Sequence, residues 1–477
     1  MAETIDADIC VIGGGSGGLT VAAGASYLGA KVVLFERGRM GGDCLNYGCV
    51  PSKALLAAAK LPALARRAPT FGVHFGMPDV DFAAVGRHVH GVIASIAPFD
   101  SVARFEGLGV RVIQAPARFV ARDRAEGGGV AVRARRFVIA TGSRAAVPPI
   151  PGLDRVPFLT NETVFDNPNL PDHLVVIGAG PIGLEMAQAH RRLGARVTVL
   201  EALPSALTKD DPELAALVIE HLRAEGIEFR FGAAVTGVAG GPGDIRVTLG
   251  GRDGAGGDTL SASHLLVAAG RRPNLEDLGL DAAGVKHSPK GIAVDKRLRT
   301  SNRKIFAVGD CAGGPQFTHI AGYHGGIVLR NALFRLPAKV DHDTIPWVTF
   351  TDPELAHAGL SEAAARQRYG AIRILRWPYA ENDRAQAERE THGMIKIVTS
   401  KRGRILGADI VGAHAGELIQ PWVLAVAKKL GVGAMAGIVL PYPTLGEIGK
   451  RASGTYFARS LFDPRLRWVV RMLGRFG

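Results

Sequence analysis

The chain has 477 residues, which predicts about three domains at roughly 150 residues per domain. Its 47% hydrophobic and 21% charged content is typical of globular proteins and excludes a disordered, collagen-like or coiled-coil chain. The net charge of +13 would suit nucleic acid or an anionic membrane as a partner. Four cysteines are too few for a disulfide-stapled secreted scaffold.

The first residues do not read as a secretory signal. Residues 1–8 are acidic and polar, and an apolar strand is predicted directly after them over residues 9–12. We expect no membrane-spanning helix, because the sequence has no uninterrupted run of about 18 apolar residues. These features predict a cytoplasmic protein, in which closely spaced cysteines serve catalysis or metal binding more often than structure.

A glycine-rich turn follows the first predicted strand. It has the G-x-G-x-x-G spacing through three glycines, Gly13, Gly15 and Gly18. The first allows a tight turn, the second lets a pyrophosphate approach the backbone, and the third lets helix pack on strand. A helix is predicted over residues 19–28 and a second strand over residues 31–35, which ends at Glu36. Glu36 is placed to accept hydrogen bonds from ribose hydroxyls, so we favour a dinucleotide site over a purely structural turn.

The same unit returns later in the chain. A strand over residues 174–177 precedes the glycines Gly178, Gly180 and Gly183, and a strand over residues 196–200 ends at Glu201. In both copies the acid follows the first glycine by 23 residues. Two complete units imply two dinucleotides, and the natural pair is a bound flavin and an exchanging nicotinamide cofactor.

Cys44 and Cys49 lie between the two units, five positions apart at a predicted helix start. Such a pair can form a reducible disulfide, and the helix dipole with a nearby lysine would favour a thiolate. The alternatives are a buried cysteine pair or half of a zinc site. Zinc needs further ligands, and the remaining Cys10 and Cys311 stand in apolar contexts that suit burial. We therefore predict redox chemistry and no metal site.

Further motifs follow in a fixed order. They are ATGS at residues 140–143, AGRRPN at 269–274, FAVGD at 306–310 and PWVTFTDPE at 346–354. Together with the two glycine motifs and the cysteine pair, they make the sequence similar over essentially its whole length to the class I pyridine nucleotide–disulfide oxidoreductases. Glutathione reductase, dihydrolipoamide dehydrogenase and mercuric reductase are members of this family.

The resemblance implies an α/β fold with two Rossmann-like dinucleotide-binding domains and an α+β dimerisation domain. We expect an FAD-binding domain in two parts, 1–150 and 271–340, and an NAD(P)-binding domain over 151–270. A dimerisation domain with a basic amphipathic tail is expected over 341–477. The resemblance also implies a homodimer.

The resemblance also assigns roles to single residues. Cys49 would face the flavin as a thiolate, Cys44 would meet the substrate, and Lys53 would sit near the flavin ring and pair with Glu185. The alternative to a catalytic role is that Lys53 and Glu185 are charged residues on helix surfaces that face solvent. The residues expected at FAD are Gly13, Gly15, Gly18, Glu36, Lys53, Thr141, Gly142 and Asp310. Those expected at the nicotinamide nucleotide are Gly178, Gly180, Gly183, Glu201 and Gly270.

The choice of nicotinamide cofactor turns on Glu201. A carboxylate there favours a free ribose 2′-OH and repels a 2′-phosphate. Residues 202–205 carry no positive charge, although Arg196 and Lys209 would favour NADPH if they folded back. We predict NAD(H), with NADP(H) less favoured.

The acceptor end departs from the commonest family pattern. Where many relatives have a histidine in H-P-T-x-x-E, this chain has Tyr442, with Glu447 retained. A tyrosine, with an ordinary pKa near 10, is a poorer proton shuttle at neutral pH than histidine near 6.5. Tyrosine is what mercuric reductases show at this place, but their carboxyl-terminal cysteine pair is missing, since no cysteine follows Cys311.

We therefore predict an FAD-dependent NAD(P)H oxidoreductase that passes electrons through Cys44–Cys49 to a small disulfide, quinone or metal ion. The alternatives are a mercuric reductase lacking the carboxyl-terminal cysteine pair, a dihydrolipoamide dehydrogenase, and a membrane-surface flavoprotein that serves a partner.

Part of the charge excess lies at the carboxyl end. Residues 451–477 contain six arginines and a single acid, Asp463. Among the arginines, apolar residues recur at near-helical spacing: Leu466, Val469, Val470, Leu473 and Phe476. This pattern suits a helix that binds a partner or the inner face of the membrane. A helix packed on the dimerisation domain, with its arginines reaching solvent, is slightly favoured over that interpretation. Nucleic acid is not expected.

Overall fold

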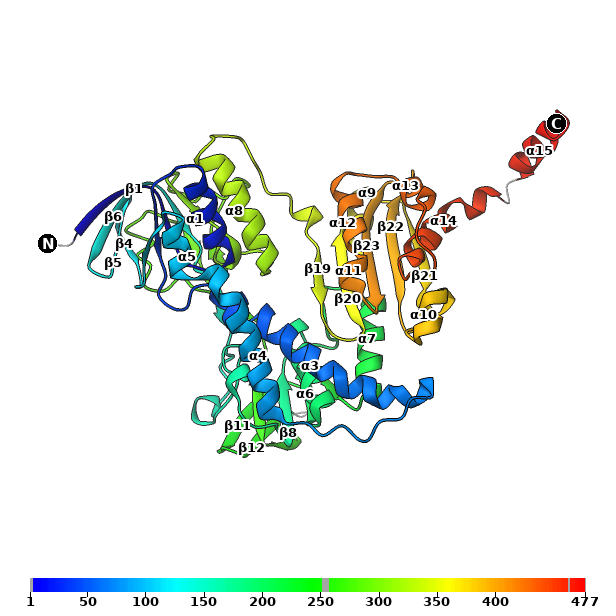
Figure 1. Cartoon of the computed structure of the whole chain (residues 1–477), viewed down its shortest axis with the longest axis horizontal. Coiled ribbons are helices and arrows are strands. Elements are labelled where there is room, and N and C mark those ends of the chain that lie inside the picture. Colours follow the sequence, from blue (N-terminus) through cyan, green and yellow to red (C-terminus); the bar gives the residue numbers. More distant parts are fainter. Residues whose placement is uncertain (1–2, 251–256, 462–463, 477) are drawn as a thin grey trace. The chain divides into compact units, whose positions relative to one another are not determined.

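The protein is described here by a computed structural model that covers residues 3–250, 257–461 and 464–476 (Figure 1). The chain forms two compact units. The first unit comprises residues 1–202 and 232–340, and the second comprises residues 203–231 and 341–477. The predicted fold class, with two Rossmann-like domains and an α+β dimerisation domain, is confirmed, and the sheet of the dimerisation domain is antiparallel. The predicted boundaries at 150, 270 and 340 stay a prediction.

A seven-stranded sheet forms the centre of the first unit. Its order is β3-β2-β1-β6-β5-β4, with β18 paired to β6. The strands are β1 (Glu3–Ile12), β2 (Val32–Phe35), β3 (Arg111–Ile113), β4 (Arg118–Ala121), β5 (Arg124–Gly127), β6 (Val130–Ile139) and β18 (Ile305–Ala307). β1, β2, β3, β6 and β18 pair in parallel, and β4 and β5 close one edge antiparallel. The continuous apolar run in β1 fits a parallel strand that is covered on both faces.

Helices cover this sheet. α1 (Ser16–Tyr27) and α8 (Thr318–Ala332) pack side by side, as Figure 1 shows. Leu19, Val21 and Val328 join Ile9 and Val11 in one buried cluster, which fixes both helices on the sheet. The remaining helices before residue 110 are α2 (Gly42–Asn46), α3 (Cys49–Arg67), α4 (Phe82–Ile96) and α5 (Val102–Gly107).

The second glycine unit builds a separate parallel sheet. Strands β8 (His173–Ile177), β9 (Arg196–Glu201) and β14 (His264–Val267) pair in parallel, and α6 (Pro181–Leu193) connects the first two. An antiparallel sheet of β11 (Val235–Gly241), β12 (Asp244–Leu249) and β13 (Thr259–Ala262) shares a buried core with it. Two short strands, β7 (Ser143–Ala145) and β15 (Arg271–Pro273), form a further antiparallel pair.

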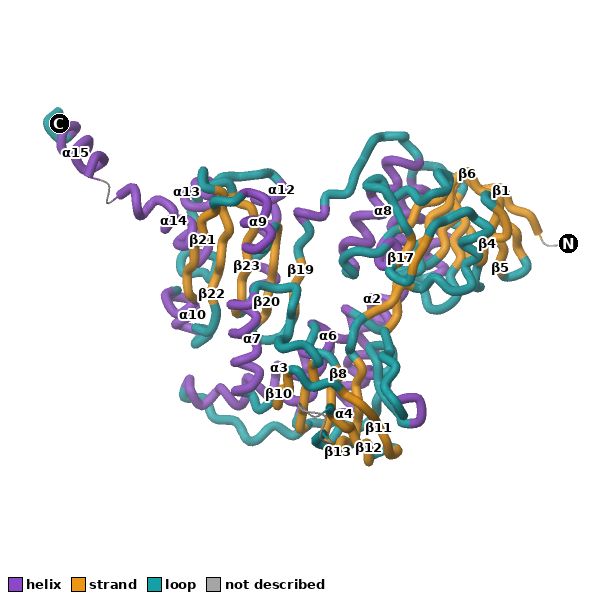
Figure 2. Tube along the Cα trace, turned by 180° about the vertical axis from the view of Figure 1, so that it is seen from behind, coloured by secondary structure: helices purple, strands orange, loops and turns teal. Residues whose placement is uncertain are grey.

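The second unit is built on a five-stranded antiparallel sheet (Figure 2). Its order is β19-β20-β23-β22-β21. The strands are β19 (Trp347–Thr349), β20 (Glu354–Gly359), β21 (Ile372–Pro378), β22 (Met394–Ser400) and β23 (Ile405–Gly412). The unit's helices include α7 (Pro212–Ala224), α9 (Glu362–Tyr369), α10 (Asp383–Glu388), α11 (Ala415–Leu418), α12 (Gln420–Ala427), α13 (Val432–Gly437), α14 (Glu447–Leu461) and α15 (Pro464–Leu473). Ile395, Ile397 and Trp422 belong to its apolar core.

A polar row crosses this sheet. Neighbouring register positions on the five strands are held by Trp347, His357, Asp409, Lys396 and Arg376. Helix α7 packs against β20 and β23 and brings acidic residues to the row. The Lys396 ammonium lies 2.7 Å from Asp211, 3.0 Å from Glu213 and 2.9 Å from Glu362 of α9. Since Lys396 is buried, these carboxylates supply the hydrogen bonds that water would otherwise provide.

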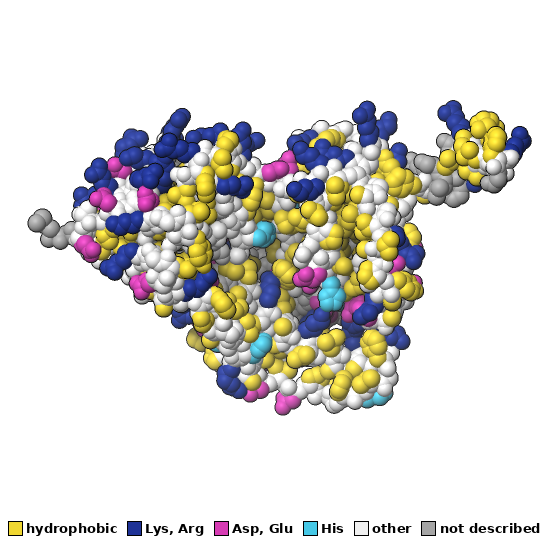
Figure 3. All heavy atoms as spheres, turned by 45° about the horizontal axis from the view of Figure 1, so that its top comes forward, with side chains coloured by type: hydrophobic (Ala, Val, Ile, Leu, Met, Phe, Trp, Pro, Cys, Tyr) yellow, Lys and Arg dark blue, Asp and Glu magenta, His cyan; other side chains and the backbone are white. Residues whose placement is uncertain are grey.

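Within the described ranges, every helix is too short or too polar to cross a bilayer. On the face drawn in Figure 3, lysine and arginine side chains outnumber acidic ones, in keeping with the net charge of +13.

Candidate functional site

The segment that carries the cysteines is packed against the first glycine loop. Gly41 and Gly42 have φ values of +86° and +61°, in the left-handed region that favours glycine. A Cβ at Gly42 would lie 2.7 Å from the Cα of Gly15, and the Gly41 amide donates to the Gly14 carbonyl at 2.9 Å. The backbone therefore holds the cysteine segment directly beside the loop predicted to bind a dinucleotide.

The two thiols lie within hydrogen-bond reach of each other. Cys44 is part of α2 and half-buried, whereas Cys49 opens α3 and is exposed; both are free thiols in this structure. A hydrogen bond from Cys44 is the largest cause that lowers the pKa of Cys49 to about 6, and the same contact raises the pKa of Cys44. The α3 amino terminus also favours a thiolate. Cys49 is thus the thiolate and Cys44 the protonated partner.

Thr318 is a third member of this cluster that the sequence analysis missed. Its hydroxyl oxygen lies 3.4 Å from the Cys49 sulfur, and it lowers the pKa of both cysteines by hydrogen bonding. The residue is 269 positions from Cys49, so no local motif links them. The sequence signal that points to it is its place at the start of the helix after the Asp310 motif.

Lys53 and Glu185 form an ion pair beside the thiols. The lysine nitrogen lies 2.7 Å from the Glu185 carboxylate, and the Glu185 side chain is only 6% exposed. The pair joins α3 to α6, which pack together. The Lys53 charge lowers the pKa of Cys49 and the Glu185 charge raises it. The solvated-charge alternative does not describe Glu185, because a buried carboxylate needs its partner.

The first glycine loop meets the steric requirements of its motif. Gly13 has φ +112°, and a Cβ there would lie 2.3 Å from the Ala140 carbonyl oxygen. A Cβ at Gly18 would lie 1.9 Å from the Gly13 carbonyl oxygen. The Gly14 amide donates to a Glu36 carboxylate oxygen at 2.5 Å. Close packing at Gly13 and Gly18 and the hydrogen bond to Glu36 therefore fix the conformation of the loop.

The second loop repeats this arrangement. Gly178 has φ +110°, and a Cβ at Gly183 would lie 2.1 Å from the Gly178 carbonyl oxygen. The Ala179 amide donates to Glu201 at 2.9 Å. Gly180 is different, because a Cβ there would meet no described atom within 4 Å and its φ is −81°. The chain itself does not require glycine at 180, whereas a pyrophosphate approaching the α6 amino terminus does.

The motifs at residues 140–143 and 269–274 are joined by hydrogen bonds. The Thr141 hydroxyl donates to the Asn274 carbonyl at 2.7 Å, and the Asn274 amide donates to the Gly142 carbonyl at 2.9 Å. Gly270, with φ +123°, leads into β15. The Arg271 guanidinium, 3.1 Å from Asp43, ties this region to the cysteine segment.

Asp310 stands in a short 3-10 turn after β18. Burial raises the pKa of its carboxyl, and a hydrogen bond from Ser143 with the nearby Arg271 charge opposes that rise. Cys311 follows in the same turn rather than in a strand, and Cys10 lies within β1. Both thiols are fully buried, and burial raises the pKa of each.

Tyr442 and Glu447 lie in the second unit. The Tyr442 side chain is 68% exposed, and its hydroxyl donates to Asp383 at 2.9 Å. This hydrogen bond raises the pKa of Tyr442, so the group is a still weaker acid than an ordinary tyrosine. Glu447 is the first residue of α14.

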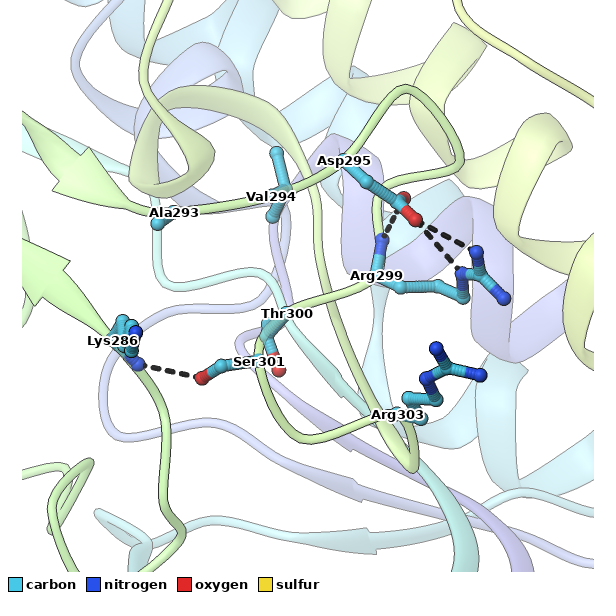
Figure 4. Close-up of a pocket in the computed structure, with 8 residues that line it drawn as sticks. All are labelled: Lys286, Ala293, Val294, Asp295, Arg299, Thr300, Ser301 and Arg303. Atoms are coloured by element: carbon cyan, nitrogen blue, oxygen red, sulfur yellow. Dashed lines mark hydrogen bonds and ion pairs between the residues drawn. The ribbon is translucent and has the colours of Figure 1, made fainter.

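A separate basic pocket of about 390 Å³ lies in the first unit (Figure 4). Its charged lining residues are Lys286, Asp295, Arg299 and Arg303, and Asp295 pairs with Arg299 at 2.8 Å. None of the residues predicted for the cofactors or the cysteine chemistry lines it. Among the described residues, no group of three or more His, Cys, Asp and Glu side chains is arranged to hold a metal ion.

Comparison with known families shows to which family the chain belongs. The sequence profile described as pyridine nucleotide-disulphide oxidoreductase matches residues 7–325, and that of the family's dimerisation domain matches residues 345–453. The chain belongs to the pyridine nucleotide-disulphide oxidoreductase family. It carries the redox-active cysteine pair Cys44–Cys49, and the family uses FAD and NAD(P)H.

Curated relatives of this oxidoreductase include two activities. The mercuric reductase of Streptomyces lividans is 36% identical, with 94% of this chain and 96% of that protein covered. The mercuric reductase of Bacillus cereus is also 36% identical, over 94% of this chain and 72% of the relative. The dihydrolipoyl dehydrogenase of Geobacillus stearothermophilus is 34% identical, over 94% and 96%.

Solved structures agree with the fold. The Cu(II) complex of the HOCl-induced flavoprotein disulfide reductase RclA from Escherichia coli has a TM-score of 0.84 and 26% identity, with 93% of this chain and 99% of that chain covered. LpdA from Mycobacterium tuberculosis has a TM-score of 0.85 and 27% identity, over 94% and 99%.

Proposed function

We propose that this oxidoreductase passes electrons from NADH through FAD to the Cys44–Cys49 pair, and from there to a small disulfide, a quinone or a metal ion. The observation that carries the proposal is the Cys49 thiol, whose pKa of about 6 leaves it ionised at neutral pH beside a protonated Cys44. In the same unit, an amide of each glycine loop donates a hydrogen bond to the glutamate that follows the loop, Glu36 or Glu201. These two similar loops support the assignment of two dinucleotides.

The residues fit both nucleotides. The open space beside Gly180 and the amides at the α6 start suit a pyrophosphate, and Glu201 suits a ribose. Gly15, Glu36, Thr141, Gly142 and Asp310 would hold the flavin nucleotide, with Lys53 near its ring. When bound, FAD accepts a hydride from the nicotinamide and delivers the electron pair to a disulfide.

The cysteines then complete a balanced exchange. The electron pair breaks the Cys44–Cys49 bond, which leaves Cys49 as a thiolate and, after uptake of one proton, Cys44 as a thiol. Cys44 gives up that proton and attacks an acceptor disulfide, forming a mixed disulfide and releasing one thiol. Cys49 attacks the Cys44 sulfur and re-forms the pair, and the second thiolate that leaves takes a proton from solvent to become the second thiol. Lys53 supports the Cys49 thiolate at each stage.

NADH is the proposed donor. Glu201 ends β9 and its carboxylate faces the loop amide of Ala179, so a 2′-phosphate would meet a negative charge. The donor is settled by initial rates with NADH and NADPH at equal concentration; a clear preference for NADPH would contradict this part of the proposal.

A metal-ion reductase is the second candidate. Its support is the 36% identity to mercuric reductases and the tyrosine at position 442, which lacks the neutral-pH proton transfer of histidine. Soft ions prefer thiolates, and Cys44 and Cys49 offer two. The overall reaction would convert NADH and Hg(II) into NAD⁺, elemental mercury and one proton.

A homodimer is part of the proposal. The dimerisation domain supports it, and Tyr442 and Glu447 of one copy would complete the cysteine site of the second copy. Light scattering measures the mass in solution; a monomer with full turnover would contradict this assignment.

The test of the proposed function is an acceptor screen with NADH. Oxidised lipoamide, glutathione disulfide, quinones and Hg(II) in excess thiol are compared for the purified FAD-loaded protein and its Cys49→Ala variant. We expect the variant to keep NADH-dependent bleaching of the flavin absorbance but to lose acceptor reduction. Equal acceptor turnover in both proteins, or no long-wavelength thiolate-to-flavin absorbance in the reduced wild type, would remove the cysteine pathway.

A further inference from the structure

Helix α15 has one apolar stripe that the described structure leaves open. Leu466, Val469, Val470 and Leu473 stand at i, i+3, i+4 and i+7, so they share one side of the helix. Val470 is 62% exposed, Leu473 is 58% exposed and Leu466 is 40% exposed. In Figure 3 the apolar side chains of this segment are visible at the surface with arginines around them.

This exposure decides between the two readings of the tail. A helix packed on the dimerisation domain would bury its stripe, as α14 buries Ile448 and Ala452 in the core of the second unit. Between residues 464 and 476, Val469 alone is partly covered and every other residue is exposed. A largely exposed apolar stripe of this kind is typical of a helix that binds an interface.

The charges of α15 are of one sign. Arg465, Arg467, Arg471 and Arg475 occur in residues 464–477, and no acidic residue does. At about 100° per residue, Arg467 and Arg471 lie on the side away from the middle of the stripe. At the same spacing Trp468, 59% exposed, lies on the arginine side of the helix and is not part of the stripe.

We propose that α15 is a membrane-surface helix that binds bilayers containing anionic lipid. The stripe would enter the boundary between headgroups and acyl chains while the arginines contact lipid phosphates. Pairing with a second copy of α15 fits less well, because residues 464–477 hold four arginines and no acid, so a second copy offers no opposite charge, whereas an anionic bilayer does. The inference is independent of the electron acceptor and of the nucleotide preference.

Vesicle co-sedimentation of the full-length, FAD-loaded protein tests this proposal. Phosphatidylcholine vesicles with and without phosphatidylglycerol are compared at low and high salt. Wild type is expected to bind the anionic vesicles in preference and to dissociate as salt rises, because screening weakens the arginine contacts. No binding to the anionic vesicles at low salt would overturn the proposal.

Two matched variants locate the contact. Val470→Asp places a carboxylate in the stripe, and Met472→Asp places the same charge off the stripe of the same helix. We expect Val470→Asp to lower vesicle partitioning about tenfold or more and Met472→Asp to lower it about twofold or less. Equal effects would overturn the stripe as the binding face. A change of molecular mass by light scattering in Val470→Asp, with vesicle binding unchanged, would assign the helix to a contact between copies instead. NADH-dependent flavin reduction serves as the fold control for both variants.

Discussion

The Lys53 ammonium lies 2.7 Å from the Glu185 carboxylate, although the two residues are 132 positions apart along the chain. The contact joins the helix that starts at Cys49 to the helix that starts at the second glycine loop. Its two charges act on Cys49 in opposite directions, Lys53 lowering and Glu185 raising the thiol pKa. One ion pair therefore connects the predicted nicotinamide loop to the reactive sulfur and adjusts the pKa of that sulfur, which the Cys44 hydrogen bond lowers most.

Opposite substitutions in this pair should move Cys49 in opposite directions. In the reduced protein, alkylation of Cys49 should rise as the pH passes through about 6, because the thiolate is the nucleophile. Near that pH, Lys53→Met should slow alkylation and Glu185→Gln should speed it, each by a factor of roughly two to ten. Iodoacetamide labelling with tandem mass spectrometry measures the rate at Cys49. Changes of the same sign in both variants would contradict an electrostatic origin.

Thr318→Val should also slow Cys49 alkylation near pH 6, because it removes a hydroxyl that hydrogen-bonds the sulfur. The effect should be smaller than that of Cys44→Ala, since Cys44 is the larger cause of the lowered pKa of Cys49. Thr318→Ser is the matched control that keeps the hydroxyl and should behave as wild type. If Thr318→Ser, which keeps the hydroxyl, were as slow as Thr318→Val, the hydroxyl would not be what lowers the pKa of Cys49.

Two alanine substitutions in the second glycine loop should separate folding from binding. Gly183→Ala should lower the free energy of unfolding by about 1–3 kcal/mol, because its Cβ would overlap the Gly178 carbonyl. Gly180→Ala should leave stability within about 0.5 kcal/mol of wild type and weaken NADH binding about tenfold or more. Urea unfolding and equilibrium dialysis measure the two quantities. Normal NADH affinity in Gly180→Ala would contradict the assignment of this loop.

Lys396→Met should destabilise the second unit by about 3–5 kcal/mol, because it leaves the buried Asp211 carboxylate without its cation. Adding Asp211→Asn should recover part of the loss, which a simple packing defect would not do. All four tryptophans, Trp347, Trp377, Trp422 and Trp468, belong to the second unit. Tryptophan fluorescence in urea therefore reports unfolding of this unit, and an additive double variant would contradict the ion-pair account.

The buried His357 should make the second unit sensitive to pH. Burial lowers its pKa, but the hydrogen bond and charge of Asp409 at 2.6 Å outweigh burial and raise the pKa above 6.5. A group whose pKa is raised on folding contributes stability that is full below the unfolded pKa and is lost as pH rises through the folded pKa. The difference in urea midpoint between wild type and His357→Gln should therefore shrink as the pH is raised from 6. A difference that grows with pH would show that His357 is neutral in the folded state.

The sequence predicted the parts of the molecule that local pattern controls. The predicted first helix, residues 19–28, and the observed α1, Ser16–Tyr27, differ by a few residues because glycines at a helix start leave the boundary ambiguous. Both glycine loops could be predicted because the turn, the helix start and the acid of each lie close together in the sequence. The helix at the cysteines could be predicted because the two cysteines are only five positions apart. The resemblance added the pairing of Lys53 with Glu185, which no local pattern contains.

Contacts between residues that only tertiary packing brings together could not be predicted from local sequence patterns. Thr318 reaches Cys49 because α8 packs against the first sheet, although the two residues are 269 positions apart in the sequence. Asp211 reaches Lys396 through the docking of α7 on an antiparallel sheet whose register aligns five strands. Sheet register and helix docking depend on the whole core, so single residues at such contacts carry no signature of their partners.

The hydrogen bonds from Gly14 to Glu36 and from Ala179 to Glu201 constrain how nucleotide preference can evolve. Each acid fixes its own loop, and in the proposed assignment it would also present an oxygen to a ribose. We therefore expect that replacing Glu201 by a residue without an acceptor would loosen the loop and alter ribose recognition together. The substitution Glu201→Gln keeps an acceptor for the Ala179 amide and removes the charge. We therefore expect Glu201→Gln to keep the loop in place while removing the charge that would repel a 2′-phosphate, and Glu201→Ala to weaken binding of NADH and NADPH alike.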